Sequence, residues 1–272
     1  MTKHSHCVIF TDLDGTLLDH DSYSWAPAAA AIGRIKQLHI PLIAISSKTL
    51  AELSFLNDRD DIFDGLIGEN GGVICLGDQL EHPGPTTKTI DGARNAIARA
   101  VSGPLAGFRT SSPAVIARET GLAPADAARA AQRHCSDPLI WAPTETDIAT
   151  AQSIAGEFGL KLVKGGRFHT LCGPTDKGKA MNKMIEMLIG IGRLPSPPSK
   201  PATIALGDSA NDATMLAAAD FPVQIPQKHG GAILPLIDDK KLLIAPEPGP
   251  TGWNSAINQL LDQIFNARVQ AH

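Results

Sequence analysis

Two aspartates one residue apart, Asp12 and Asp14, follow an apolar run that begins at Cys7. The apolar run predicts a short strand buried on both faces, and Gly15 after it predicts a sharp turn. Neighbouring carboxylates are costly to bury unless a cation or hydrogen bonds hold them, and Mg²⁺ prefers hard oxygen ligands of this kind. One carboxylate can then act as a nucleophile while the other exchanges a proton with the leaving oxygen. An ordinary strand end with an Asx turn is the simpler alternative.

Polar residues also follow two other apolar runs, at residues 40–45 and 202–206, and open the regular helix predicted over 177–189. These residues are Ser46, Lys48, Lys177, Asp208, Asn211 and Asp212. Ligands bind at the carboxyl edge of a parallel sheet. The set therefore predicts a group of carboxylates for one Mg²⁺, a hydroxyl and a helix N-terminus for phosphate oxygens, and an ammonium that offsets charge. Phosphoryl transfer needs these parts. Taken alone, Ser46 could be a helix cap, Lys177 a solvated lysine, and residues 208–212 a polar turn. The occurrence of all these residues at strand or helix ends favours a single site.

The order of elements predicts an α/β fold with a parallel, Rossmann-like sheet and an inserted second domain. The chain begins strand–helix–strand–helix, and this pattern resumes near residue 174. Between them, helices are predicted over 91–101, 112–120, 124–135 and 147–158, with strands over 139–141, 160–163 and 168–172. This mixed order is typical of a small α+β unit. We therefore expect a core at residues 1–83 and 174–272 and an inserted domain at 84–173.

Composition narrows the functional classes. The 272 residues are 43% hydrophobic and 19% charged with a net charge of −4, which is ordinary for a globular protein. No cluster of basic residues suggests nucleic-acid binding, and the apolar runs are too short to cross a bilayer. The four cysteines lack metal-binding spacing and are expected to be reduced. We expect no signal peptide, because the N-terminal residues run straight into the first predicted strand. We expect a cytoplasmic protein with a small-molecule partner; monomer and homodimer stay open.

Residues 12–16, Ser46, Lys177 and residues 207–212 resemble, in order and spacing, the four motifs of haloacid dehalogenase (HAD) superfamily phosphatases. The insertion resembles the C2-type cap of that superfamily. Further segments resemble more narrowly the mannosyl-3-phosphoglycerate phosphatase family. These segments are residues 10–19, 23–25, 46–49, 69–71, 165–168, 176–178 and 249–253.

The resemblance implies a role for each motif residue. Asp12 is the expected nucleophile, Asp14 the acid and base, and Ser46 and Lys177 the phosphate-binding groups. The metal ligands it implies are Asp12, the backbone carbonyl of Asp14, Asp208 and Asp212. The expected substrate-binding residues are Ser47, Lys48, Glu69, Asn70, Arg167, His169 and Asn211.

The predicted cap strand departs from the family pattern at Arg167 and His169. Relatives tend to have one more residue between the arginine and the histidine, and a one-residue shift on a strand turns a side chain to the other face. Arg167 nevertheless suits a substrate carboxylate, because the planar guanidinium donates two parallel hydrogen bonds. A solvated arginine at a strand start is the alternative.

The function that the resemblance implies is Mg²⁺-dependent hydrolysis of mannosyl-3-phosphoglycerate or glucosyl-3-phosphoglycerate through an aspartyl-phosphate. A Cof-like phosphatase for other sugar phosphates is the main alternative, and the cap decides between them. A phosphomutase and a non-catalytic ligand-binding protein are further alternatives.

Overall fold

A computed structural model describes residues 6–165, 167–228, 230, 234 and 242–269. The chain divides into two compact units. The first contains Met1–Ser46, Ile62–Gly65 and Lys177–His272, and the second contains Ser47–Asp61 and Leu66–Asp176. Among the described residues, no helix combines the length and apolar character that crossing a membrane requires.

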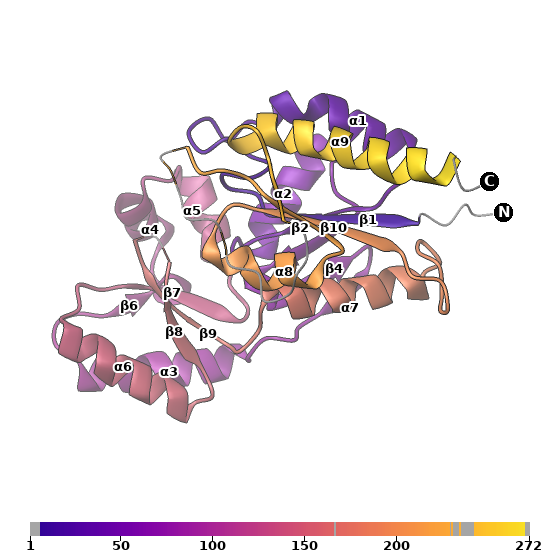
Figure 1. The fold of residues 1–272 in the computed structure, drawn as a ribbon. Helices are drawn as coiled ribbons and strands as arrows, with labels where there is room; N and C mark the ends of the chain where they lie inside the picture. Colours follow the sequence, from indigo (N-terminus) through magenta and orange to yellow (C-terminus); the bar gives the residue numbers. More distant parts are fainter. Residues whose placement is uncertain (1–5, 166, 229, 231–233, 235–241, 270–272) are drawn as a thin grey trace. The chain divides into compact units, whose positions relative to one another are not determined.

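A parallel sheet forms the centre of the first unit (Figure 1). Its strands lie in the order β12-β11-β10-β1-β2, and all neighbours pair in parallel. They are β1 (Cys7–Thr11), β2 (Leu42–Ile45), β10 (Ala202–Gly207), β11 (Phe221–Gln224) and β12 (Leu243–Ile244). The predicted buried strands are confirmed at β1 and β2, since every residue in both is buried. Thr11 pairs with Leu206, so β1 and β10 end at the same edge of the sheet.

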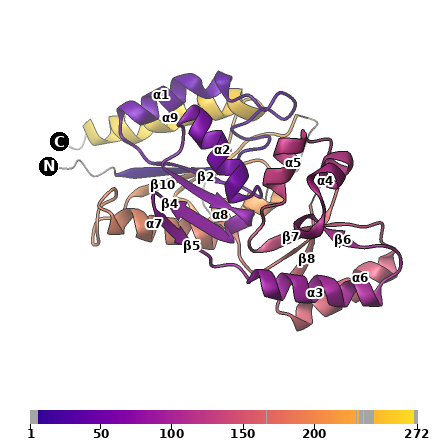
Figure 2. The ribbon, with the colours of Figure 1, turned by 180° about the vertical axis from the view of Figure 1, so that it is seen from behind.

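Helices cover both faces of this sheet. Helices α1 and α9 lie on one face, and α7 and α8 on the other (Figure 1 and Figure 2). The helices are η1 (Ala26–Ala28), α1 (Ala29–Gln37), α7 (Lys177–Gly190), η4 (Ala210–Asp212), α8 (Ala213–Ala218) and α9 (Gly249–Val269). Helix α7 forms where predicted because Met181, Met184 and Leu188 recur on one buried stripe. The predicted α/β class is confirmed.

The second unit contains two antiparallel ladders. The first pairs β3 with β4 and β4 with β5, and the second has the order β6-β7-β9-β8. The strands are β3 (Gly65–Gly68), β4 (Val73–Leu76), β5 (Gln79–Glu81), β6 (Ala106–Gly107), β7 (Ser136–Ile140), β8 (Lys161–Lys164) and β9 (His169–Cys172). The helices are α2 (Leu50–Asp60), η2 (Glu69–Gly71), α3 (Thr87–Ala100), η3 (Phe108–Thr110), α4 (Pro113–Thr120), α5 (Pro124–Ala130) and α6 (Glu145–Glu157). Apolar side chains of α3 and α6, among them Ile90, Ile97 and Ala151, share a core with Leu139 and Leu171 of the four-stranded ladder.

In this unit the end of one predicted helix was wrong, and strands β5 and β6 were not predicted. The helix predicted through Cys135 ends at Ala130, because residues 134–136 bind Glu69 and Ser136 already belongs to β7. Strand β6 was not predicted, because two residues are too few for a periodic signal.

Candidate active site

Asp12 lies immediately after β1, and only 6% of its surface is exposed. Its N–H donates to the carbonyl of Leu206 at 2.9 Å, which fixes it beside β10. The Thr11 hydroxyl donates to the Asp12 carbonyl at 2.7 Å and accepts the indole N–H of Trp253 at 3.0 Å. Trp253 is completely buried, so helix α9 holds the backbone of Asp12 through the Thr11 side chain.

Lys177, the first residue of α7, places its ammonium between two carboxylates. Its Nζ donates to Oδ1 of Asp12 at 2.5 Å and to Oδ1 of Asp212 at 2.6 Å. Burial alone lowers the pKa of an ammonium, but the charges of Asp12 and Asp212 outweigh it and raise the pKa of Lys177. A buried lysine would otherwise tend to lose its proton, so these two carboxylates keep the cation charged in the interior.

Asp12, Asp208 and Asp212 form an acidic triad in which one carboxylate oxygen from each lies within 4.8 Å of the others. Burial raises the pKa of Asp12 to about 7; Lys177 opposes the rise, whereas Asp212 and Asp14 add to it. Burial, followed by the charge of Asp212, also raises the pKa of Asp208. Three carboxylates facing one ammonium leave an excess of negative charge, which a divalent cation would offset. Hard carboxylate oxygens are also what Mg²⁺ prefers, so the triad fits this ion.

The backbone of this site requires two glycines. A Cβ added at Gly207 would lie 2.4 Å from the Cβ of Asp212, which is too close for any other residue. This close approach lets Oδ2 of Asp212 accept the N–H groups of Asp208 at 3.1 Å and Ser209 at 3.0 Å. Gly15 has φ 79°, and a Cβ there would lie 3.0 Å from Oδ2 of Asp208.

Two neutral residues that the sequence did not single out as site residues hold Asp208. The Thr16 hydroxyl donates to Oδ1 at 3.4 Å. Nε2 of Gln227 donates to Oδ2 at 3.3 Å and to the Asp208 carbonyl at 3.0 Å. A ligand carboxylate needs partners of this kind to orient it. Thr16 falls within the motif around Asp12, whereas a single glutamine in a loop gives no sequence signal.

Three more predicted residues lie at the same edge of the first unit. Asp14 is half-buried and forms an isolated parallel bridge with Leu18, which closes the turn after β1. Ser46 is buried directly after β2, the strand that neighbours β1. Asn211 is exposed, and its side-chain oxygen accepts the Ser209 hydroxyl at 2.5 Å.

A pocket of about 270 Å³ opens beside the triad. Gly15 and Asp208 form part of its wall, together with Asp19, Gln227 and Lys228. This pocket therefore presents mainly polar and charged side chains of the first unit.

The other predicted site residues lie in the second unit, and their roles stay predictions. Ser47 is exposed and Lys48 half-buried. Glu69 is buried. Both Glu69 and Asn70 have a left-handed backbone conformation, with φ values of 50° and 55°. The Glu69 carboxylate accepts the N–H groups of His134 at 2.7 Å and Cys135 at 3.1 Å.

Arg167 and His169, predicted on the cap strand, have different surroundings. The guanidinium of Arg167 is exposed and donates to the carbonyls of Glu119 at 3.3 Å and Thr120 at 2.5 Å. His169 begins β9, where its ring meets the edge of Trp141 at 6.4 Å between centroids. Burial, with some help from a nearby lysine, lowers the pKa of His169, so this ring tends to be neutral.

Comparison with known proteins indicates the fold class and the family of the chain. No family model matches the chain. Among solved structures, the fold is similar to the phosphatase BT1666 of the HAD superfamily from Bacteroides thetaiotaomicron, with a TM-score of 0.66, 16% identity, and coverage of 95% of this chain and 97% of that one. It is also similar to the HAD subclass IIB sugar phosphatase BT4131, with a TM-score of 0.65, 16% identity, and coverage of 93% and 98%.

A curated relative is much more similar in sequence. The glucosyl-3-phosphoglycerate/mannosyl-3-phosphoglycerate phosphatase of Methanococcoides burtonii is 33% identical over 275 residues, which cover 95% of this chain and 98% of the relative. Together the fold, the acidic triad and this relative define a phosphatase of the haloacid dehalogenase superfamily. Within that superfamily, the chain belongs to the family of glucosyl-3-phosphoglycerate/mannosyl-3-phosphoglycerate phosphatases.

Proposed function

We propose that this phosphatase hydrolyses glucosyl-3-phosphoglycerate or mannosyl-3-phosphoglycerate, with Mg²⁺ as cofactor and Asp12 as nucleophile. The observation that carries the chemistry is the placement of Lys177 between Asp12 and Asp212, next to Asp208. The substrate class is supported by the 33% identical relative, which carries that activity in its name and matches almost end to end.

The residues would divide the reaction into two steps. An oxygen of Asp12 attacks phosphorus, the bond to the alkoxide breaks, and the Asp14 carboxyl gives the leaving oxygen a proton. Asp14 then takes a proton from a water that attacks the same phosphorus, which frees Asp12 and releases phosphate. Ser46 and Lys177 hold phosphate oxygens during both steps, and Lys177 offsets their charge.

Asp12, Asp208 and Asp212, with the Asp14 carbonyl, would hold Mg²⁺. When bound, this ion neutralises charge on the carboxylates and on the phosphoryl group. Thr16 and Gln227 serve this site by orienting Asp208, because both donate hydrogen bonds to its carboxylate.

We also propose that the insertion at residues 84–173 acts as the cap that selects the organic part of the substrate. A cytoplasmic location is supported by the four cysteines, all of which are free thiols.

The reaction class is tested with a small aryl phosphate as substrate. The protein should hydrolyse it with Mg²⁺ and stop when EDTA is added. Asp12→Asn should abolish turnover while circular dichroism stays unchanged, because the amide keeps the shape of the side chain but cannot attack phosphorus. Turnover by the folded Asp12→Asn protein would overturn the mechanism.

A further inference from the structure

The pocket beside the acidic triad is lined by residues of the first unit, and the proposed reaction gives most of them no role. Its wall begins at Asp208, a member of the triad, and continues through residues 19–20, 227–228 and 248–249. The volume of about 270 Å³ is close to the lower limit for small-molecule sites. The pocket is therefore suited to one small organic group held next to Asp208.

Asp19 fixes the loop that follows it at this wall. Its Oδ1 accepts the N–H groups of Asp21 at 3.2 Å and Ser22 at 2.9 Å, and the Ser22 hydroxyl at 2.8 Å. The Asp19 carbonyl also accepts the N–H of Tyr23 at 3.0 Å, where the backbone has φ 54°. A left-handed conformation costs free energy in a tyrosine, and such strain is often kept at ligand sites. The loop therefore presents the exposed His20 to the pocket from a fixed backbone.

Lys228 contributes an ammonium to the same wall. Its Nζ donates to Oδ2 of Asp21, so this ion pair joins the loop after β11 to the loop that Asp19 fixes. The side chain of Lys228 is 49% exposed, and an ammonium has three N–H donors, of which the ion pair uses one. Lys228 can therefore bind a ligand without losing its contact with Asp21.

The charges around the pocket favour a neutral, hydroxyl-bearing group over an anion. The ammonium of Lys228 is already paired with Asp21, whereas Asp19 and Asp208 bring two carboxylates to the wall. Hydrogen bonds from Ser22 lower the pKa of Asp19, so this carboxylate is charged at neutral pH. An anionic ligand would be repelled by these carboxylates. A sugar hydroxyl can donate to a carboxylate and accept from an ammonium, so it matches this mixture of groups.

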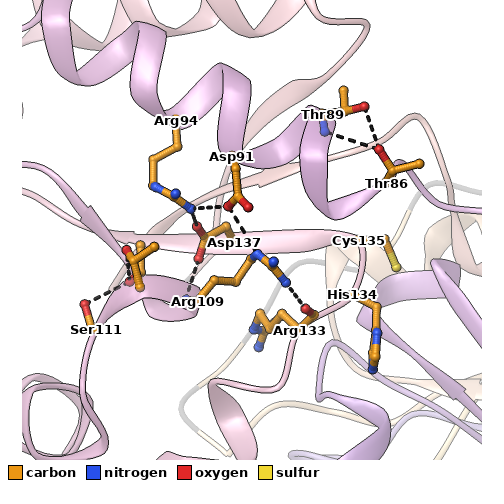
Figure 3. Close-up of polar contacts among 12 residues, drawn as sticks. Thr86, Thr89, Asp91, Arg94, Arg109, Ser111, Arg133, His134, Cys135 and Asp137 are labelled. Carbon is orange, nitrogen blue, oxygen red and sulfur yellow. Dashed lines mark hydrogen bonds and ion pairs between the residues drawn. The ribbon is translucent and has the colours of Figure 1, made fainter.

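A charged cluster of the second unit differs from this pocket, because its members pair with one another (Figure 3). Asp137 is completely buried and accepts Nη1 of Arg94 at 2.7 Å and the backbone N–H of Arg109 at 3.1 Å. The same Nη1 lies 2.7 Å from Oδ1 of Asp91. These contacts stabilise the fold of the second unit, whereas the polar groups at the pocket face an open space.

We propose that this pocket binds hydroxyl groups of the sugar part of the substrate, with Lys228 and His20 as specificity-determining residues. The proposal rests on the substrate class proposed above. It gives the first unit a share in the choice of the organic group, in addition to the proposed cap.

The test compares Lys228→Ala and His20→Ala with the wild type on three compounds. Glucosyl-3-phosphoglycerate carries both the sugar and the carboxylate, 3-phosphoglycerate lacks the sugar, and a small aryl phosphate lacks both. The first and last are measured by kcat/KM, and 3-phosphoglycerate by its Ki against hydrolysis of the aryl phosphate. Lys200→Ala is the matched control, since Lys200 forms an exposed ion pair with Asp220 of the first unit and does not line the pocket.

Lys228→Ala should lower kcat/KM for glucosyl-3-phosphoglycerate by about 10-fold, because a hydrogen bond from a charged group is lost. His20→Ala should show a smaller loss of the same kind. Both variants should leave the Ki of 3-phosphoglycerate and kcat/KM for the aryl phosphate nearly unchanged, and Lys200→Ala should match the wild type throughout. Both pocket side chains are exposed, so their removal should leave circular dichroism unchanged.

The Asp21→Asn variant separates sugar binding from loop structure. It removes the ion pair but keeps the ammonium, so it should cost less than Lys228→Ala. Equal losses in these two variants would reduce Lys228 to a structural role and overturn the proposal. A matching rise in the Ki of 3-phosphoglycerate would identify a carboxylate site instead.

The same measurements distinguish failure of this proposal from failure of the substrate class. A wild-type protein that prefers glycosyl phosphoglycerates, with no selective loss in Lys228→Ala and His20→Ala, would overturn the role of the pocket alone. A wild-type protein without that preference would overturn the substrate class, and the role of the pocket with it.

Discussion

At the scale of single residues, Lys177 determines the electrostatics of the site. A fully buried ammonium is stable only with anionic partners, and Asp12 and Asp212 supply two at hydrogen-bond distance. The same burial raises the pKa of Asp12, so its charged form is disfavoured in the protein without a metal. The cluster is therefore arranged for ligand binding at some expense of stability.

The pKa of Asp12 leads to a prediction about stability in EDTA. The folded protein raises this pKa from 3.8 to about 7, so the unfolded chain releases the proton first as pH rises. The contribution of Asp12 to the free energy of unfolding should therefore be most favourable below about pH 4, where this carboxyl is protonated in both the folded and the unfolded protein. This contribution should fall as the pH rises toward 7. The Asp12→Asn protein lacks this carboxyl, so its thermal midpoint should fall less between pH 5 and pH 8 than that of the wild type. An equal decrease of the thermal midpoint in the two proteins would contradict the raised pKa of Asp12.

Sequence reasoning found the triad and Lys177 because each of these residues follows an apolar strand or opens an amphipathic helix. It did not identify Gln227 as a site residue, because one polar residue in a loop has no period or spacing to signal a role. The indole of Trp253 was included only as part of a resemblance. Its contact with Thr11 gives that resemblance a physical reason, since it holds the backbone of Asp12.

At the scale of elements, the ends of the parallel strands position the site. Strands β1 and β10 are neighbours, so the loops after them bring Asp12 and Asp208 together. The parallel strands could be predicted, because strands buried on both faces of a sheet appear in the sequence as continuous apolar runs. The early end of α5 could not, since it depends on hydrogen bonds to Glu69, which lies more than sixty residues away in the sequence.

Glu69 offers a prediction at this scale. Its carboxylate accepts hydrogen bonds from three groups in residues 134–136, so Glu69→Gln should lower the free energy of unfolding by about 1–3 kcal/mol. Urea unfolding measures the change, with exposed Glu157→Gln as a control expected to stay within about 0.5 kcal/mol. Unchanged stability together with a large rise in KM would indicate a direct substrate contact instead.

At the scale of the whole molecule, contacts group more of the chain with the insertion than the order of the predicted elements indicated. The Thr49 hydroxyl donates to the Arg129 carbonyl at 2.9 Å, and the Arg129 guanidinium lies 3.7 Å from the ring centre of Phe55. These contacts, with those of Glu69, join α2 and its neighbours to the second unit. The order of predicted elements shows where the pattern of helices and strands changes along the chain. The contacts of Thr49, Phe55 and Glu69 could not be predicted in this way, because they join residues far apart in the sequence. The domain boundaries at 83 and 174 stay a prediction.

The central claim is that this phosphatase acts on a carboxylate-bearing glycosyl phosphoglycerate. Its most direct test is kcat/KM with Mg²⁺ for glucosyl-3-phosphoglycerate and mannosyl-3-phosphoglycerate, measured beside glucose 6-phosphate and mannose 6-phosphate. At least one glycosyl phosphoglycerate should exceed both sugar phosphates by on the order of 100-fold, because charge-assisted hydrogen bonds to the carboxylate add to binding in the transition state. Equal or higher kcat/KM values for the sugar phosphates would contradict the claim and identify a sugar-phosphate phosphatase of other specificity.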